Sequence, residues 1–142
     1  NNTIQKEYLA LVAGRPDADT GEVGTPIDVH PTDKKRMIST RHGRPARTLW
    51  QVETRFRDFT LLRVFPKTGK THQIRVHMAA IHHPLVGDQV YGKHNPKLPE
   101  FPRQALHATR LGLVHPLTGF KMQWEVPMPE DMRDLLDGLR YG

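Results

Sequence analysis

The chain has 142 residues, of which 37% are hydrophobic and 25% are charged, with twelve prolines and eleven glycines. This composition is typical of one soluble globular domain with many turns, and no run approaches the roughly 20 apolar residues that a membrane helix needs. The chain contains no cysteine. A disulfide scaffold, a thiolate zinc site and a cysteine nucleophile are therefore excluded together.

The net charge of +6 and the pI near 9.9 would attract polyanions. Many of the cations are arginines, which suit bidentate contact with phosphate. Nucleic acid is thus the leading class of partner, and a merely soluble basic protein is the alternative that charge alone leaves open. The absence of cysteine favours a reducing cytoplasm. Asn1 is neither an initiator methionine nor the start of an apolar signal, so we expect a processed or truncated end.

Short extended pieces are predicted for the first third of the chain. Tyr8 to Val12 is an apolar run that stops at a glycine and proline turn, which is typical of a strand. Asp17 to Gly24 is polar and is predicted to be turn-rich, and Ile27 to Val29 is predicted to be one brief extended piece. Thr32 to Arg47 is dense in Lys and Arg and predicts a basic loop with some extended backbone.

A hairpin and a helix are predicted next. Trp50 to Phe56 alternates apolar and polar residues with the period of a half-buried strand, and Phe59 to Phe65 follows closely enough to pair with it. Apolar residues then recur at helical spacing from Ile74 to Ile81. Thr71 is predicted to cap this helix of about three turns, and Pro84 to end it.

The last third predicts a second hairpin and a second helix. Leu85 to Gly92 is punctuated by glycine and predicts a structured turn, and His94 to Pro102 predicts a surface loop. Leu106 to Val114 and Phe120 to Val126 read as two paired strands, and the proline and acidic residues from Pro129 mark a helix start. The fold class is therefore α+β, a mostly antiparallel sheet with a few flanking helices.

Neither a metal site nor a nucleotide-hydrolase loop is supported by the spacing of the obvious candidates. His72, His77 and His82 are five residues apart, which places successive rings about 140° round a helix rather than on one face. We therefore predict no metal, and expect these histidines to pack, cap or touch phosphate. The segment from Lys67 resembles the end of a phosphate-binding loop, but Val64 stands where its first glycine would be required.

Two residues have both a structural and a chemical interpretation. Arg75 lies one turn into the predicted helix, where an arginine is either a snorkelling surface residue or the partner of a buried carboxylate. Tyr8 is either one more aromatic residue in a strand or a ring that stacks on a base taken out of its helix. Helix and strand geometry alone favours the structural interpretation of each. Trp50, Phe59 and Trp124 are predicted to lie in the core.

Two neighbouring segments carry a resemblance to a known family. Thr68 to Met78 reads TGKTHQIRVHM and His83 to Gly92 reads HPLVGDQVYG, and together they resemble the signature of RluA-type RNA pseudouridine synthases, closest to the RluD-like enzymes of large-subunit ribosomal RNA. Further agreement is found at Lys6 to Val12, Gly43 to Thr48 and Arg103 to Ala108. The resemblance extends over nearly the whole chain.

The resemblance implies a cofactor-free isomerase that flips a uridine out of RNA and rejoins its uracil through carbon 5. It implies that Tyr8 stacks on the flipped base and takes part in proton transfer, and that Arg75 pairs with a catalytic aspartate. The implied RNA-binding residues are Lys70, His72, Arg44 and Arg103. Lys70 stands where many relatives have arginine, a departure that keeps the charge but loses the planar fork.

A larger departure concerns the aspartate. In the family it lies in a His-Arg-Leu-Asp type motif before the tyrosine, and no Arg-Leu-Asp occurs in this chain. We therefore expect residues 1–142 to be the C-terminal portion of the catalytic domain, inactive alone, with the aspartate upstream. Asp88 belongs to the glycine turn and is assigned a structural role. A non-catalytic RNA-binding module of the same fold is the alternative function. As an isolated piece the chain is expected to form oligomers or exchange strands, because unpaired strand edges associate.

Overall fold

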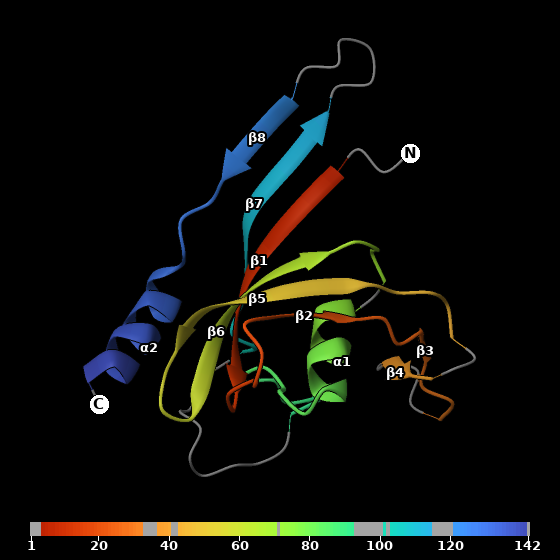
Figure 1. Ribbon diagram of the computed structural model, residues 1–142, viewed down its shortest axis with the longest axis horizontal. Helices are drawn as coiled ribbons and strands as arrows, with labels where there is room; N and C mark the ends of the chain where they lie inside the picture. Colours follow the sequence, from red (N-terminus) through yellow and green to blue (C-terminus); the bar gives the residue numbers. More distant parts are fainter. Residues whose placement is uncertain are drawn as a thin grey trace.

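The computed structural model describes residues 4–32, 37–40, 43–70, 72–92, 101, 103–114 and 121–141. One sheet contains β1 (Ile4–Ala13), β2 (Thr20–Val23), β5 (Thr48–Arg55), β6 (Phe59–Pro66), β7 (Leu106–Val114) and β8 (Lys121–Glu125). A second, two-stranded sheet pairs β3 (Ile27–Val29) with β4 (Met37–Ser39), and the helices are α1 (Gln73–Ala80) and α2 (Glu130–Tyr141). The larger sheet has the order β2-β5-β6-β1-β7-β8, and every neighbouring pair is antiparallel (Figure 1).

The two faces of the large sheet are covered by different helices, because alternate residues of a strand point to opposite faces. On one face Ala10 and Leu62 pack with Ile74 and Met78 of α1. On the other face Leu11, Phe59 and Leu61 pack with Met132 and Leu136 of α2. Leu11, Leu62 and Met78 are fully buried, and each such side chain contributes about 1.5–3 kcal/mol relative to exposure. β1 and β6 thus form the centre of both cores.

The predicted α+β fold class and its antiparallel hairpins are confirmed. β5 and β6 pair across the turn at Arg57 and Asp58, and β7 pairs with β8. Trp50 and Phe59 are buried as predicted, whereas the side chain of Trp124 lies outside the described residues. None of the described helices is long and apolar enough to cross a membrane.

Two local predictions need correction. Asp17 to Gly24 was predicted to be turn-rich and no strand was expected there, but Thr20 to Val23 forms the edge strand β2 because it pairs with the start of β5. The basic segment Thr32 to Arg47 was predicted to contain some extended backbone, and it contains β4, which pairs with β3. The first helix has eight residues, nearer two turns than three.

The ends of that helix also differ from the prediction. The residue at its N-cap is His72, in the left-handed backbone region with φ 54°. The predicted cap, Thr71, lies outside the described residues, as do the hairpin turn at 115–119 and all of the predicted loop His94 to Pro102 except Phe101. The helix ends at Ala80, four residues before Pro84.

Candidate active site

The large sheet splits into a fork beside Tyr8. β1 and β6 pair from Tyr8 opposite Val64 to Ala13 opposite Phe59. On the other side of this point, Phe65 and Pro66 of β6 pair with β5, while Ile4 to Glu7 of β1 pair with β7. A register shift between Glu7 and Tyr8 accompanies the split. Figure 1 shows β1 and β7 rising away from β5 above α1.

A cavity of about 370 Å³ lies at this fork. β1 contributes Lys6 and Tyr8 to its lining, the turn after β6 contributes Thr68 to Lys70, and α1 contributes His72 and Arg75. A volume of this size falls within the range of small-ligand sites. The cavity brings together four of the six residues that the sequence marked as functional, from segments up to about 70 positions apart.

Gln73 holds the turn that forms one lip of the cavity. Its side-chain oxygen accepts hydrogen bonds from the Thr68 hydroxyl at 2.6 Å and from the Lys70 backbone N–H at 3.1 Å. Its side-chain nitrogen donates to the Arg47 carbonyl and to the Thr48 hydroxyl, each at 2.9 Å. The buried amide therefore uses two donors and two acceptor sites at once, which fixes the turn to β5.

Arg75 is held by Asp88 inside the same region. Its Nε and Nη2 donate to the two carboxylate oxygens of Asp88, both at 2.9 Å. The hydrogen bond with Asp88 raises the pKa of the guanidinium. The guanidinium carbon also lies 5.1 Å from the ring centre of Tyr91, within the range of a cation–π contact. Within the described chain the carboxylate paired with Arg75 is Asp88, whereas the pairing with a catalytic aspartate that the resemblance implied stays a prediction.

His72 connects the cavity to the same network. Its Nδ1 lies 2.8 Å from the Tyr91 hydroxyl, and the two rings meet edge to face. Burial, and then the positive charge of Arg75, lower the pKa of His72 below its ordinary value, although Asp88 opposes this shift. The lowered pKa favours the neutral imidazole at pH 7, and the predicted contact of His72 with RNA stays a prediction.

The remaining candidate residues lie outside this cavity. Arg44 is exposed and forms a bridge with Ile27 in the small sheet. Arg103 donates to both carboxylate oxygens of Asp131 on α2, at 3.0 and 3.1 Å. The structure therefore gives Arg103 a contact within the chain, and its predicted contact with RNA stays a prediction.

Two further histidines of the predicted cluster make hydrogen bonds inside the chain. His77 is fully buried, with its ring nitrogens bonded to Thr48 and to the Thr25 carbonyl, and His83 contacts the Ala13 carbonyl. Within the described part of the chain, no three His, Asp or Glu side chains gather as a metal site would require. His77 and His83 therefore have structural contacts, and a contact of the histidines with phosphate stays a prediction.

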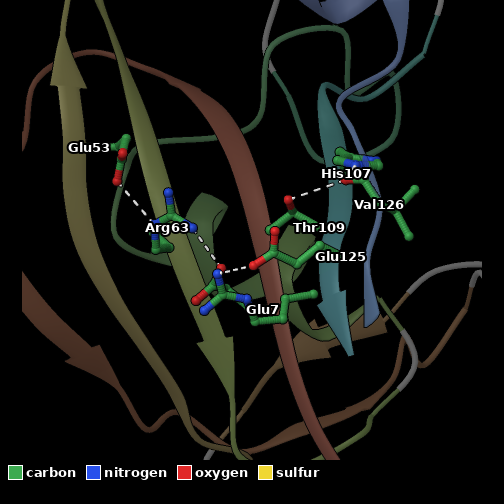
Figure 2. A network of polar contacts seen from close by, with 8 residues as sticks. Glu7, Glu53, Arg63, His107, Thr109, Glu125 and Val126 are labelled. Atoms are coloured by element: carbon green, nitrogen blue, oxygen red, sulfur yellow. Dashed lines mark hydrogen bonds and ion pairs between the residues drawn. The ribbon is translucent and has the colours of Figure 1, made fainter. Parts of the chain in front are cut away.

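The opposite face of the fork is bridged by charge. Arg63 on β6 donates to Glu53 on β5 at 3.0 Å and to Glu7 on β1 at 2.6 Å, and Figure 2 shows Arg63 between these two carboxylates. Glu7 precedes Tyr8, so this pair joins β1 to β6 beside the point where their backbone pairing begins. Both side chains are largely buried, which makes the contact stronger than an exposed pair.

Sequence reasoning missed three contributors to this site. Lys6 lines the cavity, but nothing in its local pattern distinguishes it from other surface lysines. Gln73 lies within the motif but was given no role of its own, although its four hydrogen bonds organise the lip. Asp88 was assigned to its turn alone, and its pairing with Arg75 joins residues that no periodicity relates.

The chain is similar in sequence to known proteins over nearly its whole length. A family model described as RNA pseudouridylate synthase matches residues 1–80. The chain is 48% identical over 148 residues to a protein of Salmonella typhimurium named ribosomal large subunit pseudouridine synthase D, covering 96% of this chain and 45% of that protein. Identity to the protein of the same name from Nitrosomonas europaea is 46%, covering 97% of this chain and 42% of the relative. The chain therefore spans a little under half the length of these curated relatives.

Solved structures show the same fold. The human protein named RNA pseudouridylate synthase domain containing 1 superposes with a TM-score of 0.77 at 23% identity, covering 99% of this chain and 67% of that one. Human RNA pseudouridylate synthase domain containing 4 gives a TM-score of 0.75 at 24% identity, covering 96% and 62%. These two likenesses concern the fold.

Proposed function

Because the chain belongs to the RNA pseudouridylate synthase family, we propose that the protein to which it belongs converts uridine to pseudouridine in ribosomal RNA. The observation that carries the proposal is the cavity at the fork, which places Tyr8, Lys70 and Arg75 around one space. The named relatives of Salmonella and Nitrosomonas support ribosomal RNA as the substrate. Action on ribosomal RNA would place the protein in the cytoplasm.

The reaction is an isomerisation whose atoms and electrons balance without an external oxidant or reductant. The bond between N1 of uracil and C1′ of the ribose breaks, and a bond between C5 and C1′ forms. The proton on C5 is released, and N1 gains one. The protein must therefore bind the base outside its helix, hold the ring while it turns, and move one proton.

The residues around the cavity suit these tasks. The Tyr8 ring offers a stacking surface for a flipped base, which offsets part of the few kcal/mol that flipping costs. Its hydroxyl can transfer the C5 proton. Lys6 and Lys70 supply positive charge at the rim for neighbouring phosphates. Arg75 is proposed to hold a carboxylate that acts on the sugar or base, since a paired arginine keeps a carboxylate ionised.

We propose that this carboxylate comes from a segment of the protein outside residues 1–142. No Arg-Leu-Asp motif occurs in this chain. The Asp88 side chain is fully buried and already bonded to Arg75, so it is poorly placed to attack a substrate. The chain would then supply the tyrosine and arginine half of a complete site.

The test is release of tritium from ribosomal RNA made with 5-tritiated uridine, because forming the C5 bond displaces the hydrogen at that carbon. We expect no release by residues 1–142 alone and release when the upstream segment is joined to them. Release by the chain alone would refute the proposed division of the site. If the joined protein releases no tritium but binds RNA tightly, a non-catalytic RNA-binding module is favoured.

We also propose that residues 1–142, when separated from the rest of the protein, associate or exchange strands. The outer strands β2 and β8 lie at the edges of the described sheet, and unpaired strand edges favour association. Light scattering at several concentrations measures the mass, and a monomer throughout would contradict this proposal.

A further inference from the structure

The contact between Arg75 and Asp88 is among the most buried ion pairs in the described part of the chain. The Asp88 side chain is 0% exposed and the Arg75 side chain 13% exposed. Both carboxylate oxygens are used, each at 2.9 Å from a guanidinium nitrogen. A bidentate pair fixes the orientation of the guanidinium plane as well as its position.

Asp88 is itself immobilised by the turn that contains it. Its Oδ1 accepts the backbone N–H groups of Val90 and Tyr91, both at 3.0 Å, and its carbonyl accepts the N–H of Gly92. Burial alone would raise the pKa of Asp88, but the hydrogen bonds from Arg75 and from these backbone groups together lower it. The carboxylate is therefore ionised at neutral pH and has a fixed direction.

Tyr91 limits the remaining freedom of Arg75. Its ring faces the guanidinium at 5.1 Å, and its hydroxyl accepts the Met37 backbone N–H at 2.8 Å. Asp88 holds one edge of the guanidinium while Tyr91 covers one face. Arg75 is thus oriented by the chain itself, without a bound substrate.

The pair leaves most of the Arg75 donors unused. A guanidinium has five N–H groups in one plane, and Asp88 takes one from Nε and one from Nη2. The hydrogen bonds of Arg75 to described residues leave from Nε and from one N–H of Nη2 only, so the edge formed by Nη1 and the second N–H of Nη2 keeps its donors, and Arg75 lines the cavity. A second carboxylate could bind this edge while Asp88 stays in place.

We propose that Asp88 is a positioning residue, which orients Arg75 so that its unused edge receives the reactive carboxylate of the complete site. The inference rests on the proposed function. Asp88 also compensates part of the Arg75 charge. An uncompensated arginine would stabilise the ionised carboxylate more strongly, lower its pKa and weaken it as a nucleophile. Among the described residues, His72 and Tyr91 interact electrostatically with Arg75, and the titratable groups Lys6, Tyr8 and Lys70 line the same cavity.

The test compares Asp88→Asn with Asp88→Glu in the complete protein by tritium release. Asp88→Asn removes the charge and one half of the bidentate contact. We expect kcat to fall by about a hundredfold, as for small misplacements of catalytic groups, with KM changed little. We also expect the acid limb of the pH profile of kcat to move to lower pH. Asp88→Glu keeps the charge, and its kcat should lie between those of Asp88→Asn and the unaltered protein, with the acid limb unmoved.

The matched control is Asp19→Asn. Asp19 forms an Arg–Asp pair with Arg55 at 2.8 Å, its side chain is 85% exposed, and neither residue lines the cavity. The same substitution there should leave kcat and the pH profile unchanged.

Any of three results overturns the inference. An unchanged pH profile in Asp88→Asn, with any loss confined to the amount of folded protein, would show a merely structural role. If Asp88→Asn fails to fold, Asp88→Glu carries the test, and a kcat equal to that of the unaltered protein would refute positioning. If the unaltered complete protein releases no tritium, the proposed function is wrong and this inference falls with it. If the complete protein is active and both Asp88 variants have the same kcat and pH profile as the unaltered protein, this inference alone is wrong.

Discussion

Replacing Thr48 by valine should measure how much a series of buried hydrogen bonds beside the cavity contributes to the stability of the protein. Thr48 is fully buried at the start of β5. Its hydroxyl accepts from Gln73 Nε2 at 2.9 Å and lies 2.7 Å from His77 Nδ1. Because His77 Nε2 faces the Thr25 carbonyl at 2.8 Å, Nε2 carries the proton of the neutral ring, and the Thr48 hydroxyl donates to Nδ1.

The expected cost follows from the two partners left behind. Valine matches threonine in shape but has no polar atom, so a Gln73 N–H and the His77 Nδ1 lose their partners in the interior. Each unsatisfied buried group costs about 1–3 kcal/mol, and the added methyl group recovers about 0.8 kcal/mol. We therefore expect Thr48→Val to lower the free energy of unfolding by about 1–5 kcal/mol, more than a variant that loses a single partner.

Thr60→Val is the matched control in urea denaturation followed by tryptophan fluorescence. Thr60 is equally buried, but its hydroxyl donates one hydrogen bond, to the Gly14 carbonyl at 2.8 Å. With a single partner lost and the methyl group gained, this variant should lose about 0–2 kcal/mol. If Thr48→Val lowers the free energy of unfolding no more than Thr60→Val does, Thr48 does not connect Gln73 and His77 in the way described.

Three further predictions concern pH, the lip and the rim of the cavity. Burial lowers the pKa of His77 in the folded protein below the value of about 6.5 in the unfolded chain. The free energy of unfolding should therefore be highest above about pH 6.5 and should decrease as the pH falls toward the lower pKa of the folded state. A urea midpoint that is constant from pH 7.5 to 5 would contradict this. Gln73→Ala should accelerate hydrogen exchange at the Lys70 amide, which the Gln73 side chain accepts at 3.1 Å, and an unchanged exchange rate would disprove its role in the lip. Lys70→Ala should reduce the salt dependence of RNA binding by about one unit of slope while Lys70→Arg preserves it, and equal slopes in the two variants would remove Lys70 from the phosphate contacts.

Local patterns predicted those elements whose two faces differ in polarity. The alternation in β5 and the apolar face of α2 report burial on one side, so the sequence alone identifies both. β2 has only four residues, of which Val23 alone is buried. It is a strand because it pairs with the edge of β5. This pairing joins residues far apart in the sequence, so the local pattern of apolar residues does not predict it.

The resemblance predicted individual candidate residues of the site, but it did not predict how they are arranged in space. Tyr8, Lys70, His72 and Arg75 were named from motif positions, and the structure brings all four to the cavity. Their assembly depends on the fork between β1 and β6, which arises from pairing registers. The partner of Arg75 depends on where the turn at Asp88 folds back over α1, and residue spacing gives no measure of that.

The most direct test of the central claim is to replace Tyr8 by alanine in the complete protein. Tritium release under single-turnover conditions and RNA affinity are measured in parallel. If the uridine reacts in the cavity beside Tyr8, release should fall to background. The dissociation constant for RNA should change little, because the net charge of +6 would still attract the phosphates of the RNA. Unaltered single-turnover release, with or without weaker binding, would contradict the account and place the chemistry elsewhere.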